Sequence, residues 1–215
     1  MAVLLLNVSA FAQSAANPAQ PIQLHPQNSH YFLFQGKVVA LITSGEHYGA
    51  VINADVDYHR YLATLAAEGM NYTRLFAGSY LEVPAKSFGI LRNDLAPAPG
   101  RFLAPWARST APGYAGGGNK FDLEQWNPEY FSRLRDFLGE AERRGIVVEI
   151  GLFSSQYGRE QWNLSPFNRD NNVNATEGID WKKVNTPENG NILAHQERYV
   201  RKIVREANTF ANALF

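Results

Sequence analysis

The sequence predicts an α/β fold built from parallel β/α units. Strand-like apolar runs and helix-like apolar stripes alternate along the chain, in the order strand, helix, strand, helix, strand, helix, strand. This alternation is typical of a parallel sheet with helical crossovers. Gly69 and Gly145 make tight turns from helix to strand, whereas the connections that follow strands are long. Long loops on one side predict a binding or active site at the carboxyl ends of the strands.

The composition is that of one globular domain or part of a larger one. The chain has 215 residues, of which 45% are hydrophobic, enough to build a core. The 20 basic and 20 acidic side chains cancel, which argues against a nucleic-acid partner. Cysteine is absent and no two of the five histidines are spaced as a helical zinc pair, so we expect no metal site. The sequence contains no phosphate-loop motif, and we expect no cofactor. No apolar stretch reaches about 18–20 residues, the length needed to span a membrane.

Residues 1–12 resemble a secretory signal peptide. A short apolar stretch is followed by an Ala-x-Ala cleavage pattern that ends at Ala12, as in such peptides. No basic residues precede it, which leaves a plain apolar terminus as the alternative. Residues 13–27, with their Asn, Pro and Gln, then form a linker, and residues 28–215 form the domain. This division predicts a secreted or periplasmic protein.

The first β/α unit follows two strand-like runs. Residues 31–34 and 38–43 are joined by a glycine-containing turn of hairpin length. The second run is nearly all apolar, as expected of a strand covered on both faces. Residues 55–68 carry an apolar stripe with helical spacing, and Gly69 stands where a glycine commonly ends a helix. Residues 71–76 then read as the next strand.

The same unit recurs twice. Asn127 and Pro128 are the residue types preferred at the N-cap and first position of a helix, and an apolar stripe follows them. Residues 146–153 form a buried type of strand. Residues 192–207 have the spacing of a third helix, and residues 212–215 look like the beginning of a further strand.

Two long connections, residues 78–126 and 154–190, are rich in aromatic side chains. Flat aromatic faces pack against the apolar faces of sugar rings, while polar groups at the rim bind the hydroxyls. Packing within the loop is the alternative for any single ring. The aromatic residues of these loops and their edges are Tyr80, Trp106, Tyr114, Trp126, Tyr157 and Trp162.

Polar side chains accompany the first two buried strands. Glu46, His47 and Tyr48 follow the first of them and suit hydrogen bonding to a polar ligand, with a solvated turn as the alternative. Arg74 lies inside an otherwise apolar strand, so it needs a carboxylate partner. Glu149 is similarly placed in the next strand and is a candidate. A purely structural ion pair is the alternative to a functional arginine.

Five segments of the chain carry a resemblance to a known family: residues 25–26, 31–43, 44–51, 69–74 and 121–131. They resemble the start of cellulase-like glycoside hydrolases, the retaining clan of (β/α)8 enzymes that includes glycoside hydrolase family five. In that family a Gly-x-Asn-x-x-Arg segment forms the second strand, and its Arg supports the nucleophile carboxylate. The resemblance gives this supporting catalytic role to Arg74.

The resemblance implies a TIM barrel that is truncated after about the start of strand four. The family's acid/base Glu ends strand four and its nucleophile Glu ends strand seven, so both are expected downstream of residue 215. Retaining hydrolysis needs two carboxylates about 5–5.5 Å apart, and we expect this chain alone to be inactive. Half a barrel would also leave open sheet edges, which favour self-association.

The leading hypothesis is a fragment of a glycoside hydrolase that cleaves O-glycosidic bonds in a polysaccharide or oligosaccharide. The side chains assigned to the substrate are Glu46, His47, Tyr48, Trp106 and Phe153, which stand at or just after strand ends or in the long loops. One alternative is a non-catalytic carbohydrate-binding protein that uses the same loops. The other is a small doubly wound α/β domain of unrelated function.

Overall fold

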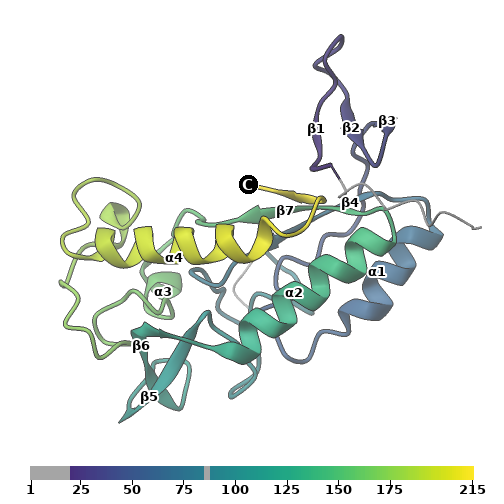
Figure 1. The fold of residues 1–215 in the computed structure, drawn as a ribbon. Coiled ribbons are helices and arrows are strands. Elements are labelled where there is room, and N and C mark those ends of the chain that lie inside the picture. Colours follow the sequence, from purple (N-terminus) through teal and green to yellow (C-terminus); the bar gives the residue numbers. More distant parts are fainter. Residues whose placement is uncertain (1–19, 85–87) are drawn as a thin grey trace, which may run out of the picture.

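A computed structural model describes residues 20–84 and 88–215 (Figure 1). The predicted signal peptide and the first part of the predicted linker lie outside the described residues. Within the described part of that linker, Gln23–Leu24 forms β1. The described residues form three small sheets and four α-helices.

The first sheet is an antiparallel hairpin with one added strand. β1 pairs with β2 (Phe32–Phe34), and β2 pairs with β3 (Lys37–Val39). Gln35 and Gly36 connect β2 to β3 with φ angles of 49° and 73°. Positive φ at both central residues gives a turn whose twist matches that of the strands.

The hairpin packs against the amino-terminal end of the central sheet. Ile22 and Phe34 form a small buried cluster with Val147 and Ala211. The peptide N–H of Ile22 donates to Ala211 O at 2.7 Å. Figure 1 shows β1, β2 and β3 standing away from the helices at this end of the molecule.

The central sheet is parallel, with the order β4 (Tyr72–Phe76), β7 (Val147–Gly151), β8 (Ala213–Leu214). The predictions of adjacent parallel strands at 71–76 and 146–153, and of a strand starting within 212–215, are confirmed. Alternate residues of β4 are buried, because successive side chains of a strand point to opposite faces. In β7 both Val147 and Val148 are buried, because the N-terminal hairpin covers Val147.

Three long helices lie together on one side of this sheet: α1 (Tyr58–Ala67), α2 (Pro128–Arg143) and α4 (Ile192–Ala207) (Figure 1). All three helices were predicted, and the span predicted for the third, 192–207, is confirmed; the first begins three residues later than predicted. Asp57 caps α1 by accepting a hydrogen bond from the N–H of Arg60, and Asn127 caps α2 in the same way. The buried helix faces and the buried sheet face form one hydrophobic core.

The two long connections contain structure that sequence periodicity did not predict. β5 (Trp106–Pro112) and β6 (Asn119–Trp126) form an antiparallel ribbon. α3 (Arg159–Trp162) and a 3₁₀ turn at Trp181–Lys183 lie in the second connection. In the described part of the chain, no helix combines the length and apolar character needed to cross a membrane.

The predicted (β/α)8 TIM-barrel fragment is wrong. The described residues form two antiparallel sheets beside one three-stranded parallel sheet, and no closed barrel occurs among them. The error begins at residues 38–43, predicted as the first parallel strand. Lys37–Val39 instead pairs antiparallel with β2, because the tight turn brings it back onto the preceding strand.

The side chain of Asn71 holds the segment that follows β3. Its side-chain Nδ2 donates to Ala40 O at 2.8 Å, and its Oδ1 accepts from the N–H of Ile42 at 2.7 Å. The backbone of this segment touches β4 again where the N–H of Phe76 donates to Tyr48 O at 2.9 Å. The segment therefore runs beside β4. The side-chain amide of Asn71 makes hydrogen bonds to it that backbone groups would make in a regular pair of strands.

Candidate functional site

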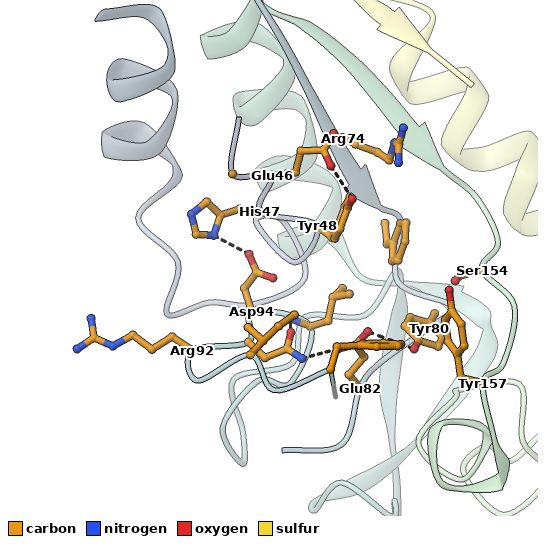
Figure 2. A pocket seen from close by; sticks show the side chains of 16 residues that line it. Glu46, His47, Tyr48, Arg74, Tyr80, Glu82, Arg92, Asp94, Ser154 and Tyr157 are labelled. Atoms are coloured by element: carbon orange, nitrogen blue, oxygen red, sulfur yellow. Dashed lines mark hydrogen bonds and ion pairs between the residues drawn. The ribbon is translucent and has the colours of Figure 1, made fainter. Parts of the chain in front are cut away.

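A cavity of about 480 Å³ opens at the carboxyl ends of β4 and β7 (Figure 2). Four segments contribute to its wall: residues 45–48, the end of β4 with the residues up to 82, residues 88–95, and the start of the loop after β7. The cavity therefore lies on the side where the sequence places its long connections.

Four of the predicted site residues line this cavity: Glu46, His47, Tyr48 and Arg74. Trp106 and Phe153 do not. Trp106 is 1% exposed and packs in the core against Phe167 and Tyr199. Phe153 contacts the edge of Tyr199, with ring centroids 5.6 Å apart. The structure thus brings together the residues of one turn and one strand, and leaves both of these rings outside.

Glu46 is held by its neighbour Tyr48. The Tyr48 hydroxyl donates to Glu46 Oε2 at 2.5 Å, and this bond raises the pKa of Tyr48. The phenol therefore stays protonated and remains a donor at neutral pH. The Tyr48 ring stacks on Phe76, with centroids 4.8 Å apart and planes 12° apart. This stacking fixes the direction of the hydroxyl and hence of the carboxylate.

His47 binds Asp94, a residue of the opposite wall (Figure 2). His47 Nδ1 lies 2.8 Å from Asp94 Oδ2, and the imidazole ring contacts the edge of Tyr61. The hydrogen bond to Asp94 raises the pKa of His47, although partial burial opposes the rise. A Cβ atom at Gly49 would lie 2.2 Å from Asp94 O, so only glycine permits this close approach.

Glu82 is a buried carboxylate in the cavity wall. Its Oε1 accepts from the Tyr80 hydroxyl at 3.3 Å, and its Oε2 accepts from the side-chain amide of Asn93. Its own N–H donates to Leu95 O at 2.8 Å. Burial raises the pKa of Tyr80, so this phenol also stays protonated. These bonds tie segment 88–95 to the chain that leaves β4.

Arg74 forms a group with Tyr72 and Glu149 on one face of the parallel sheet. Arg74 Nε lies 2.9 Å from Glu149 Oε1, but its N–H is not directed at the oxygen, so the contact is an ion pair. The Tyr72 hydroxyl donates to Glu149 Oε2 and accepts from Arg74 Nη2 at 3.4 Å. Glu149 is therefore the carboxylate partner of Arg74, although both side chains are more than one third exposed rather than buried. Tyr72 first, and the Glu149 charge after it, raise the pKa of Arg74.

Aromatic rings form one continuous side of the cavity. Phe76, Tyr80, Tyr157 and Phe88 contact each other edge to face, with successive centroid distances of 5.9, 6.2 and 5.3 Å. Tyr80 is buried, whereas Tyr157 and Phe88 are 62% and 68% exposed. The cavity thus presents open ring faces at its mouth.

Sequence reasoning missed Glu82 and Asp94. Both lie in a connection that was expected to lack regular structure, and neither has a motif around it. A signal existed for Glu82, because a single carboxylate between Leu81 and Val83 shortly after a strand suggests a buried acid. Over the described ranges, no group of three or more His, Asp or Glu side chains is placed to hold a metal ion.

Comparisons with known proteins find a structural likeness only. No protein family matches the sequence, and no curated protein is significantly similar to it. The fold is similar to a crystal structure named as that of a "putative glycoside hydrolase" from Bacteroides vulgatus, with a TM-score of 0.56 and 14% identity. The match covers 93% of this chain and 32% of the other, so this chain spans about a third of its neighbour's length. At this identity the likeness shows a shared fold.

Proposed function

We propose that the cavity at the carboxyl ends of β4 and β7 binds a sugar unit of an oligosaccharide or polysaccharide, in a protein that acts as a glycoside hydrolase. The observation that supports this best is the combination of three oriented carboxylates with exposed ring faces in one cavity. The named activity of the structural neighbour agrees with it.

The carboxylates suit the recognition of sugar hydroxyls. Glu46, Glu82 and Asp94 each receive a hydrogen bond from a neighbouring side chain. A carboxylate has about four acceptor positions, so each can also accept from a ligand hydroxyl. Because the protein donors already orient them, little side-chain freedom is lost when a sugar binds.

The rings at the mouth suit the apolar faces of the same sugar. Tyr157 and Phe88 are the exposed members of the aromatic row. A pyranose has hydroxyls around its rim and C–H groups on its faces, so it can contact a ring and a carboxylate together.

The hydrolytic part of the proposal concerns the whole protein. The retaining mechanism implied by the sequence resemblance uses two carboxylates, and in it Arg74 has a supporting role. Arg74 lines the cavity and is oriented by Tyr72 and Glu149. Its fixed positive charge would orient an acidic side chain or a sugar oxygen rather than react.

We also propose that the protein works outside the cytoplasm, secreted or in the periplasm. This rests on the signal-peptide pattern at residues 1–12 and on the substrate class. A polysaccharide that is supplied from outside is too large to enter a cell intact, so an enzyme that cleaves it has to be exported.

A non-catalytic carbohydrate-binding protein is the second candidate. It is favoured by the fact that each cavity carboxylate is already hydrogen-bonded to a neighbouring residue. Such bonds hold acceptors in place for a ligand. A general acid instead needs a raised pKa and free access to the glycosidic oxygen.

Calorimetric titration with cello-, xylo- and manno-oligosaccharides tests binding. Tyr157→Ala should weaken binding about three- to tenfold, because a lost ring contact is worth about 0.5–1.5 kcal/mol. Tyr31→Ala is the matched control, since Tyr31 is also exposed but lies on the N-terminal hairpin away from the cavity. An equal loss in both variants would contradict binding at this cavity.

A reducing-sugar assay on the same samples separates the two candidates. Release of reducing ends supports a hydrolase, and binding without release supports the non-catalytic alternative. If no oligosaccharide binds and none is cleaved, both proposals fail.

A further inference from the structure

A second cavity, of about 650 Å³, adjoins the first. Glu82 lines both cavities, so they share part of one wall. The second cavity has a different character, because apolar side chains and prolines make up most of its lining. Among them are Leu81, Phe102, Tyr114 and Leu164. Its size falls within the range of small-molecule sites.

Contacts within the chain shape the walls of this second cavity. Phe102 and Tyr114 are 9% and 5% exposed, and their rings are stacked with centroids 6.3 Å apart. The Tyr114 hydroxyl donates to Leu164 O at 2.9 Å. A Cβ atom at Gly116 would lie 2.6 Å from the Tyr114 ring. Tight packing on several sides therefore fixes the position of this ring.

Arg108 adds a polar group to the apolar wall. Its guanidinium lies over the rings of Tyr114 and Phe121, with its central carbon 4.5 and 3.9 Å from the centroids. Its Nη1 donates to Asn119 O at 2.7 Å. A guanidinium carries five N–H groups, so this bond leaves donors for an oxygen atom of a ligand. The two ring contacts hold the plane of the guanidinium.

These features do not suit a second sugar unit. Glu160 and Asn163 also line the cavity, but most of its wall is apolar. A pyranose would therefore leave several hydroxyls without a partner, which opposes binding. A flat apolar group with an oxygen acceptor fits better, because its faces can lie against Leu81 and Phe102 while Arg108 binds the oxygen. Glu82 belongs to the walls of both cavities, so the two cavities lie next to each other.

We propose that the second cavity binds the aromatic aglycone of an aryl glycoside whose sugar lies in the first cavity. This inference rests on the proposed sugar-binding function. It narrows the substrate class from oligosaccharides in general to glycosides that carry an aromatic group with an oxygen substituent.

Calorimetric titration with matched methyl and 4-nitrophenyl glycosides of glucose, xylose, mannose and galactose tests this assignment. For the sugar that binds, the 4-nitrophenyl glycoside should bind about tenfold more tightly than the methyl glycoside, because its ring leaves water for an apolar cavity. Equal affinities would overturn the proposal.

Variants then locate the aromatic ring. Ala98 is exposed and lines the second cavity but not the first, so Ala98→Trp should place an indole where the aromatic group would bind and remove most of the tenfold gain. Affinity for the methyl glycoside should stay unchanged. Ala63→Trp on the exposed face of α1 is the matched control and should retain the gain. Retention of the gain in Ala98→Trp would show that the ring binds elsewhere.

Arg108→Met tests the polar contact. The substitution keeps an extended apolar side chain and removes the donors, so the gain should shrink about threefold while the melting temperature stays close to that of the wild type. An undiminished gain would overturn the role of Arg108.

A last titration, with 4-nitrophenol alone, separates the two proposals. If no glycoside binds, the proposed sugar site fails, and 4-nitrophenol reports on the second cavity by itself. Binding that Ala98→Trp abolishes would then support an aromatic site there. Absence of binding would overturn it.

Discussion

Arg74 and Glu149 are direct partners across two adjacent parallel strands. The β4–β7 register sets their Cα atoms opposite each other, and Arg74 Nε lies 2.9 Å from Glu149 Oε1. Their side chains are 38% and 36% exposed, so the pair lies on the face of the sheet opposite the helices rather than in the core. At this position the pair contributes little to the stability of the fold. It is better suited to orienting the charged Arg74 side chain.

Removing this ion pair should change stability little. We expect Arg74→Met and Glu149→Gln each to lower the free energy of unfolding by less than about 1 kcal/mol, because water screens a half-exposed pair. Urea denaturation of both variants and of the double variant gives their coupling energy. A loss of about 3 kcal/mol or more in either variant would indicate a buried pair instead. Oligosaccharide affinity should fall more in Arg74→Met than in Glu149→Gln, since Arg74 lines the cavity and Glu149 does not.

Gly49→Ala should destabilise the cavity wall. The added methyl group would meet the carbonyl of Asp94 at 2.2 Å, so one backbone segment must move, at a cost of about 1–3 kcal/mol. Gly139→Ala is the matched control. Gly139 lies inside α2, where a Cβ would meet only ordinary contacts at 3.5 Å or more. Alanine should stabilise the helix there by about 1 kcal/mol. Thermal unfolding should therefore shift in opposite directions, and equal shifts would show that the close approach at Gly49 is unimportant.

The His47–Asp94 contact should make stability depend on pH. The folded state raises the pKa of His47 above its ordinary value, chiefly through the hydrogen bond to Asp94. A raised folded-state pKa contributes stability that is complete below the unfolded value of about 6.5 and is lost as pH rises through the folded value. The difference in unfolding free energy between wild type and Asp94→Asn should thus be larger at pH 5.5 than at pH 8.5.

This pH effect should stay below about 1 kcal/mol, because the His47 side chain is 48% exposed and screened by water. Urea denaturation across the pH range measures it, and an NMR titration should show the His47 pKa falling in Asp94→Asn. A difference that grows with pH would contradict the assigned contact.

Trp106 should prove to be a core residue. Trp106→Ala removes a fully buried indole that packs against Phe167 and Tyr199, and it should lower the free energy of unfolding by about 3–5 kcal/mol. Trp181→Ala is the control, because Trp181 is only partly buried and should cost much less. Denaturant unfolding followed by circular dichroism measures both. If Trp106→Ala had normal stability but no longer bound sugar, Trp106 would belong to the binding site instead of the core.

Local elements were the part most accessible from sequence. The span predicted for the third helix, 192–207, is that of α4, and Asn127 caps α2 as its position indicated. The parallel pairing of residues 71–76 with 146–153 also followed from the order of the elements. Residues 119–126 carried a missed signal, since Phe121 and Leu123 alternate with charged residues and a run of glycines precedes them.

Part of the site was accessible for the same reason. Glu46, His47, Tyr48 and Arg74 stand at or near the carboxyl ends of predicted strands, which meet at one edge of a parallel sheet. The segment before Glu46 is no strand of that sheet, but it runs beside β4 and therefore still ends at the cavity. Trp106 was assigned to the substrate because a loop tryptophan and a core tryptophan look alike in a sequence. Its burial depends on Phe167 and Tyr199, which are far from it along the chain.

The sequence alone determined the helices, the cap of α2, the N-terminal hairpin turn, the parallel strand pair and the edge where the cavity lies, because these depend on spacing within a few residues or on element order. Only the tertiary structure decided that the segment after this hairpin forms no parallel strand beside β4, that Asn71 holds this segment, and that Glu82 and Asp94 enter the cavity. An apolar run can satisfy its backbone hydrogen bonds with either neighbour, and which neighbour is used depends on contacts between distant residues. The local sequence pattern does not reveal such contacts.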